Sequence, residues 1–167
     1  MNKEQVVPEI VKNAVKTLEN SGFQAYLVGG CVRDLLLGKK PKDWDITTNA
    51  KPEEIQKLFT KTVYENSFGT VAVINEEAND ETLKTIEITP YRTETTYSDR
   101  RHPDNVSFSN SINDDLKRRD FTINAIAVNL SGDALKDIID LYGGISDIQS
   151  KIIKTVGNPI DRFSEDA

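Results

Sequence analysis

Apolar residues recur along the chain at two different spacings, which predict helices and strands in alternation. Residues 6–18 place Val, Ile, Ala and Leu at helical spacing, and Ser21 and Gly22 follow as a stop. Residues 26–28 form a short apolar run that is typical of a buried strand, and residues 43–47 alternate as a strand does. We therefore expect strands and helices interleaved in an α/β fold.

The middle of the chain predicts a helix, a hairpin and a long loop. Pro52 and two glutamates begin a helix that is expected to run to residue 59. Residues 68–74 and 83–89 are rich in branched apolar side chains, and the acidic segment between them is typical of a hairpin loop. Residues 93–111 are polar without a period, which predicts a long loop.

The composition is that of a soluble globular protein, with 167 residues of which 37% are hydrophobic and 29% charged. No apolar run approaches the roughly 18 residues needed to cross a membrane, and the N-terminus lacks the apolar core of a signal peptide. We expect a cytoplasmic protein without a membrane partner. The single Cys31 and single His102 exclude an internal disulfide and a His/Cys zinc site, so oxygen must hold any metal. Cys31 is expected to be a small buried residue and not a nucleophile.

The charge balance limits the partners of the chain. A net charge of −6 and a pI near 4.9 argue against an extensive nucleic-acid surface, because phosphate contacts need clustered lysines and arginines. An RNA would be bound locally, or through a basic surface that lies outside these residues.

The first candidate site is a strand, a glycine turn and a helix. Gly29 and Gly30 let the backbone approach a ligand, and the helix that follows presents free N–H groups to an anion such as phosphate. Arg33 adds a planar fork for phosphate oxygens. A glycine pair after a strand is also typical of an ordinary turn.

Three carboxylates are candidate metal ligands or catalytic groups. Asp43 and Asp45, two positions apart on a strand, face the same side and can converge on divalent cations. An isolated pair of this kind is also typical of a solvated edge or an Asx turn. Glu87 lies between two isoleucines and faces away from them, either as a third acidic group of the site or as an exposed strand glutamate.

The second candidate site lies in residues 114–127. Arg118 and Arg119 offer guanidinium groups to a triphosphate, Asp120 offers a carboxylate to a ribose hydroxyl, and Asn124 offers a further hydrogen-bonding group. The pattern by itself also fits a capped helix with a charged first turn.

These motifs follow one another as GGCVRD, DWDITT, EITPYR and RRDFTINA. Their order and spacing resemble the class II tRNA nucleotidyltransferase and bacterial poly(A) polymerase family, a branch of the polymerase-β-like nucleotidyltransferases. The resemblance implies an α/β (α+β) head with a small mixed or antiparallel sheet, packed by helices on one side. It implies Mg²⁺ at Asp43 and Asp45, with Glu87 as a third catalytic acid. It also implies nucleotide binding by Gly29, Gly30, Arg33, Arg119, Asp120 and Asn124, with Arg118 the poorer candidate of the two arginines.

The C-terminal part resembles the same family. The glycines of DLYGGISDI, residues 140–148, are either a hinge or a plain turn. Glu165 and Asp166 match the start of the family's E-D-x-x-R motif, whose Asp and Arg pair with the incoming base, so Asp166 is a further expected nucleotide-binding residue. Since the chain stops before that Arg, we expect a head domain over residues 1–140 and the truncated start of a neck domain over residues 141–167.

The reaction implied by the resemblance is CCA addition to the 3′ end of tRNA. An RNA 3′-hydroxyl would attack the α-phosphate of CTP or ATP and release pyrophosphate. A loop like that of residues 93–111 occurs in CCA-adding members of the family, which favours them here. The alternatives are a poly(A) polymerase, which shares the head motifs, and a nucleotide-binding module without catalysis.

Overall fold

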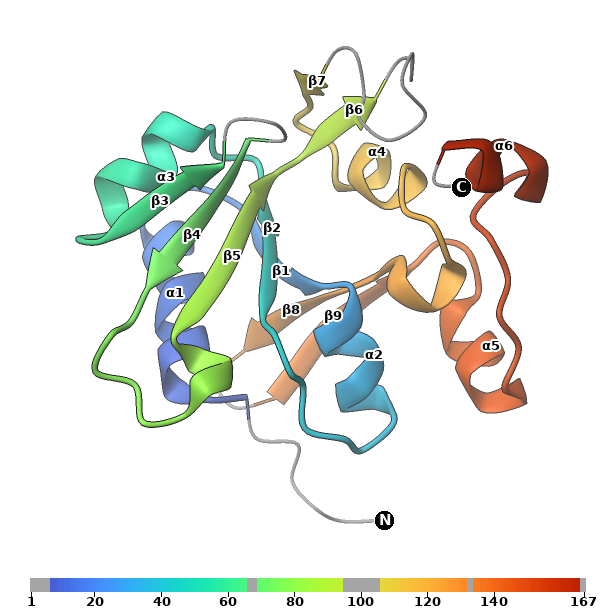
Figure 1. Cartoon of the computed structure of the whole chain (residues 1–167), viewed down its shortest axis with the longest axis horizontal. Helices are drawn as coiled ribbons and strands as arrows, with labels where there is room; N and C mark the ends of the chain where they lie inside the picture. The colour runs from blue at the N-terminus through green and yellow to red at the C-terminus, as the bar shows by residue number, and fades with distance from the viewer. Residues whose placement is uncertain (1–6, 66–68, 95–105, 132–133, 166–167) are drawn as a thin grey trace.

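The computed structural model of the chain describes residues 7–65, 69–94, 106–131 and 134–165. Helices and strands alternate along it, as the apolar spacing predicts (Figure 1). In chain order the elements are α1 Glu9–Asn20, β1 Ala25–Val28, α2 Gly30–Leu36, β2 Asp45–Thr48, α3 Pro52–Leu58, β3 Thr62–Glu65, β4 Thr70–Ile74, η1 Glu81–Leu83, β5 Thr85–Pro90, β6 Arg92–Glu94, β7 Val106–Phe108, α4 Ile112–Lys117, η2 Thr122–Asn124, β8 Ile126–Ser131, β9 Ala134–Asp140, α5 Gly144–Ser150 and α6 Pro159–Glu165.

A mixed sheet with the strand order β3-β4-β5-β2-β1-β8-β9 forms the centre of the fold. Its neighbouring strands are antiparallel except for β2 and β5, which run parallel. The pair β4–β5 confirms the predicted hairpin, with Val73 opposite Ile86. The strand β6 follows β5 along the chain and pairs with β7 in a separate two-stranded ribbon (Figure 1).

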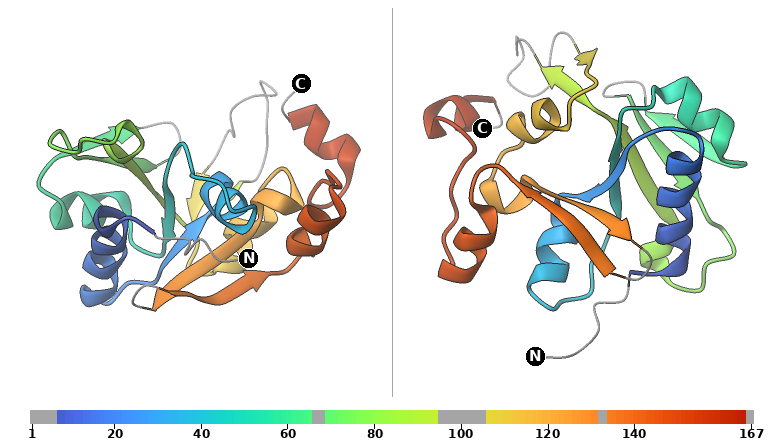
Figure 2. Two further views of the ribbon diagram at one scale, coloured as in Figure 1. Left: turned by 90° about the horizontal axis from the view of Figure 1, so that it is seen from below. Right: turned by 180° about the vertical axis from the view of Figure 1, so that it is seen from behind.

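Helices cover both faces of the sheet. On one face α1 and α3 lie side by side, as Figure 2 shows, and the α1 residue Leu18 packs in the same core as Ile46 of β2. On the other face α4 contributes Leu116, which packs against Val28 of β1 and Ala127 of β8. The expectation of helices on one side only is therefore wrong. Apolar side chains of the same strands also point to the second face, and they need a helix to cover them.

The strand that carries the two aspartates is shorter at its start than predicted. The strand β2 begins at Asp45, where pairing with β5 begins, and Asp43 lies in the turn before it. Trp44 between them is buried, with 2% of its surface exposed. The sheet thus fixes the position of Asp45, whereas the position of Asp43 depends on the turn.

The second candidate segment begins inside the helix α4, whose first turn holds Asp114 and Asp115, and its two arginines follow the end of that helix. The helix α4 ends at Lys117, so Arg118 and Arg119 follow its last turn and lead into η2. Two parts of the predicted loop 93–111 are strands, because β6 and β7 pair there with Thr93 opposite Ser107. Residues 95–105 lie outside the described part of the chain.

The segment after the sheet folds back onto η2. The strand β9 ends at Asp140, where the predicted head domain also ends. The helix α5 contacts η2, and Gly144 lies so close to the Thr122 carbonyl that a Cβ on this glycine would overlap it. Phe121 and Thr155 form an isolated antiparallel bridge farther along. Gly143 and Gly144 therefore form a turn in which the second glycine is required by close packing against Thr122. The division into head and neck stays a prediction.

Candidate active site

The parallel pairing of β2 and β5 brings two of the predicted carboxylates together. Asp45 and Glu87 are register partners, so their side chains leave the sheet on the same face. The Glu87 N–H donates to the Trp44 carbonyl at 3.0 Å, which extends the pairing by one residue. Asp45 is half-buried, whereas Asp43 and Glu87 are exposed. The sheet thus positions one inner carboxylate with an outer one beside it.

The inner carboxylate is destabilised in its charged form. Burial is the largest cause that raises the pKa of Asp45 to about 6. The charges of Asp43 and Glu87 act in the same direction, and the Arg119 guanidinium opposes them. A cation close to Asp45 would offset both the cost of burying its negative charge and the repulsion from the other two carboxylates.

The donor chemistry of this cluster suits a hard cation that also binds phosphate. All three side chains offer carboxylate oxygens, which Mg²⁺ prefers, and Mg²⁺ is commonly held by one or two carboxylates together with the phosphates of a substrate. Within the described ranges, no three His, Cys, Asp or Glu side chains converge closely enough to hold an ion by themselves. The donor chemistry of Asp43 and Asp45 by itself suits Mg²⁺.

The glycine turn between β1 and α2 lies directly against the acidic cluster. Gly29 has a φ of 77° and a ψ of −141°, a conformation that favours glycine. A Cβ on Gly29 would lie 3.3 Å from Nη1 of Arg119 and 3.4 Å from Oδ2 of Asp45. A Cβ on Gly30 would lie 3.8 Å from Oδ1 of Asp43. A side chain on Gly29 would be strained by the positive φ and tight against Arg119, whereas a Cβ on Gly30 would meet Asp43 at an ordinary contact distance.

Cys31 ties the turn to the acidic strand. Its thiol donates to the Val28 carbonyl at 3.1 Å and to the Asp45 carbonyl at 3.7 Å. Burial raises the pKa of this thiol to about 12. Cys31 is thus a small buried residue without nucleophilic character, which confirms the prediction from sequence.

Arg33 is hydrogen-bonded to the second candidate site, residues 114–127. Arg33 donates from Nη1 to Oδ1 of Asn124 at 2.9 Å, although the two residues are 91 positions apart. Its Nε also donates to Oδ1 of Asp34 at 3.0 Å. Nδ2 of Asn124 donates to Oδ1 of Asp120 at 3.4 Å. Three predicted nucleotide-binding residues, Arg33, Asn124 and Asp120, therefore form one hydrogen-bonded chain.

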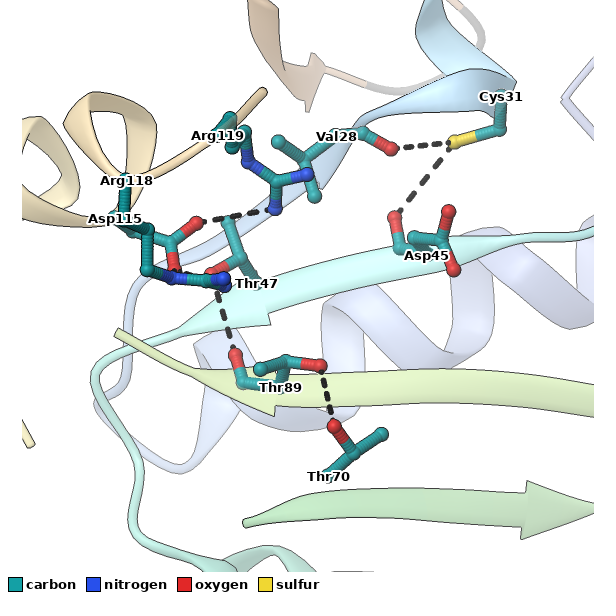
Figure 3. A network of polar contacts seen from close by, with 9 residues as sticks. All are labelled: Val28, Cys31, Asp45, Thr47, Thr70, Thr89, Asp115, Arg118 and Arg119. Atoms are coloured by element: carbon teal, nitrogen blue, oxygen red, sulfur yellow. Dashed lines mark hydrogen bonds and ion pairs between the residues drawn. The ribbon is translucent and has the colours of Figure 1, made fainter. Parts of the chain in front are cut away.

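The second arginine reaches the glycine turn from the end of α4. Figure 3 shows Arg119 between Asp115 and the β1 residue Val28. Nη2 of Arg119 donates to Oδ2 of Asp115 at 3.1 Å, and Nη2 of Arg118 donates to Oδ1 of the same carboxylate at 2.8 Å. Burial acts to raise the pKa of Asp115, but the two guanidinium charges outweigh it and hold the pKa below its usual range.

Asp115 has no assigned role in the sequence-based interpretation. Its signal was the spacing, because an aspartate three and four residues before two arginines can pair with both from a helix. Of the predicted residues, the structure brings together the three acids, both glycines, Arg33, Arg119, Asp120 and Asn124. Asp166 lies outside the described residues.

An acidic cluster on a mixed α/β sheet, facing a glycine turn bordered by arginine, defines the class of the nucleotidyltransferase heads. Comparison with known families agrees with this class. Residues 25–154 match the Poly A polymerase head domain family, and the chain belongs to that family. The fold class and the family expected from the motifs are confirmed.

Known relatives are similar over nearly the whole chain. It is 46% identical to the CCA-adding enzyme of Lactobacillus helveticus (strain DPC 4571), over 100% of this chain and 40% of that protein. The crystal structure of the Bacillus stearothermophilus CCA-adding enzyme in complex with CTP superposes with a TM-score of 0.78 and 38% identity, over 96% of this chain and 37% of that one. The Thermotoga maritima CCA-adding enzyme complexed with tRNA gives a TM-score of 0.69 and 28% identity, over 92% of this chain and 34% of that one. The chain thus spans 40% of the length of the first of these relatives.

Proposed function

We propose that this chain supplies the catalytic head of a CCA-adding tRNA nucleotidyltransferase, which adds C, C and A to the 3′ end of tRNA from CTP and ATP. The observation that carries the proposal is the parallel register of Asp45 with Glu87 beside the glycine turn. The names of the relatives support CCA addition, and the CTP and tRNA bound to two of them support the same substrates here.

Each group of site residues has its own proposed role in binding the nucleotide or the metal. Gly29 and Gly30 let the triphosphate approach the backbone, and Arg33 and Arg119 compensate its charge. Asp43 and Asp45 would hold Mg²⁺, which when bound favours ionisation of the RNA 3′-hydroxyl and neutralises charge on the leaving pyrophosphate. Glu87 adds negative charge at the same end of the sheet and favours a cation there.

The bonds that change are those at the α-phosphorus of the incoming nucleotide. The 3′-oxygen of the RNA forms a new P–O bond, its proton is released, and the P–O bond to pyrophosphate breaks. Asp120 and Asn124 are placed beside Arg33 and would contact the sugar of the nucleotide. Asp166, which in the resembling family pairs with the base, is proposed for the same role. Catalysis of this kind depends on positioning and electrostatics, without a covalent enzyme intermediate.

The proposed substrate also implies a cytoplasmic protein. In the part of the chain that the structure describes, no helix combines the length and the apolar character needed to cross a bilayer.

The test is nucleotide incorporation into tRNA that lacks its last three residues. The intact enzyme that contains this head is expected to add three nucleotides from CTP and ATP with Mg²⁺ and then stop, whereas the head by itself need not be active. The D43N/D45N variant of the intact enzyme is expected to add none. Long tails from ATP alone would favour a poly(A) polymerase. Retention of CTP and ATP without release of pyrophosphate would favour a binding module. Normal incorporation by D43N/D45N would contradict the assignment of the two aspartates.

A further inference from the structure

Asp115 is a fully buried carboxylate at the edge of the proposed nucleotide site. Its side chain has 0% of its surface exposed, and it lies in the short helix α4. A buried carboxylate is costly unless its charge and its lone pairs are compensated. Arg118 and Arg119 supply that compensation from three and four residues farther along the chain.

The two oxygens of Asp115 hold the two arginines apart. Oδ1 accepts from Nε of Arg118 at 3.0 Å and from Nη2 of Arg118 at 2.8 Å, whereas Oδ2 accepts from Nη2 of Arg119 at 3.1 Å. Nε of Arg119 is buried and has no hydrogen-bond partner among the described residues. The direction of the Arg119 fork therefore depends on a single carboxylate oxygen.

This anchor decides where the other end of Arg119 lies. With Nη2 turned toward Asp115, Nη1 reaches the glycine turn, 3.3 Å from the Cβ position of Gly29. Asp45 also attracts this guanidinium, and its Oδ2 lies 3.4 Å from the same Cβ position. Without the hydrogen bond to Asp115, the Arg119 guanidinium would be drawn into a direct ion pair with Asp45. Its positive charge would then not be available to a bound phosphate.

We propose that Asp115 is a positioning residue that holds the Arg119 guanidinium at the glycine turn, where it meets the phosphates of the nucleotide. This inference rests on the proposed function, because it assumes that a triphosphate binds at Gly29 and Gly30. It adds a residue that does not touch the ligand and acts only through Arg119.

The experiment measures binding of inorganic tripolyphosphate to the full chain by calorimetry in EDTA, so that neither the base nor a metal contributes. D115N and R119M are each expected to weaken binding about tenfold, since a hydrogen bond to a charged group contributes about 1.5–3 kcal/mol. The double variant is expected to bind no worse than R119M, because Asp115 acts through Arg119. D115E, which keeps the charge, is expected to restore part of the affinity.

The matched control is D114N, one residue earlier on the same helix. Asp114 accepts a hydrogen bond from Ser109 at 2.6 Å and faces another part of the chain, so D114N is expected to bind tripolyphosphate as the wild type does. Should D115N prove too unstable to purify, D115N/R118M removes one negative and one positive charge together. It is expected to show the same tenfold loss relative to R118M alone.

Two results would overturn the inference. One is folded D115N, or D115N/R118M relative to R118M, with unchanged affinity. The other is a double variant D115N/R119M whose loss is the sum of the two single losses in free energy. Absence of tripolyphosphate binding by the wild-type chain would instead reject the phosphate site itself, and the positioning role with it.

Discussion

Asp45 and Glu87 are register partners on the parallel strands β2 and β5. In a parallel pair the partner side chains leave the sheet on the same face, so the two carboxylates repel each other. Asp43 adds to this repulsion from the turn before β2. Arg119 offsets part of this repulsion, and a bound cation or protonation would offset more of it, which is typical of a binding site.

The first prediction concerns the pH dependence of stability. The pKa of Asp45 is about 6 in the folded protein, against about 3.9 for an unfolded Asp. Between these two values the folded state binds more protons than the unfolded state, so stability falls as pH rises through about 4 to 6. The cost at pH 7 is on the order of 2 kcal/mol after allowance for partial exposure of the side chain.

The variant D45N removes this cost together with the charge. We expect D45N to be more stable than the wild type at pH 7 by about 1–2 kcal/mol, with a smaller difference at pH 4. Urea unfolding of both proteins at matched pH values measures the difference. A gap that is independent of pH would show that Asp45 titrates normally.

The second prediction separates the contributions to the pKa of Asp45. E87Q removes one like charge from the neighbouring strand, so the pKa of Asp45 should fall, by up to about one unit. Carbon-13 NMR of labelled aspartate carboxyl groups measures it. The control is E81Q, since Glu81 is an exposed residue that pairs with Lys84. An equal response of Asp45 to E81Q and E87Q would point to a general charge effect and reject the register argument.

The third prediction concerns the close packing of Gly144 on η2. A Cβ on Gly144 would overlap the Thr122 carbonyl, and the backbone there is fixed by the bond from the Gly144 N–H to Asp140 at 2.8 Å. G144A is therefore expected to lower the free energy of unfolding by at least about 2 kcal/mol. The control is G143N. A Cβ on Gly143 would meet no atom within 4 Å, and Asn tolerates the left-handed conformation of this residue. Similar urea midpoints for the two variants would contradict the packing argument.

The fourth prediction concerns the reactivity of Cys31. Because its thiol is buried, with a pKa near 12, we expect a thiol reagent such as dithionitrobenzoate to react slowly with the native protein. The rate should rise steeply when urea exposes the thiol, and the protein in concentrated urea provides the reference. Rapid labelling in the absence of urea would show that the contact between Cys31 and the carbonyls of Val28 and Asp45 opens readily.

The sequence indicated several of the elements and the candidate site residues for local reasons. Periodicity located α1 and the β4–β5 hairpin, because a helix and a strand each bury one face at their own spacing. The glycine pair and the aspartates were recognisable because their chemistry depends on neighbours in the chain. The order of four motifs then indicated the family, which the match over residues 25–154 confirms.

Only the tertiary structure decided how the motifs meet. The parallel pairing that sets Asp45 beside Glu87 depends on which strands become neighbours, and spacing along a chain does not encode this order. The contact between Arg33 and Asn124 spans 91 positions for the same reason. Asp115 escaped the sequence-based interpretation because its role depends on complete burial beside two arginines, and burial is a property of the packed molecule.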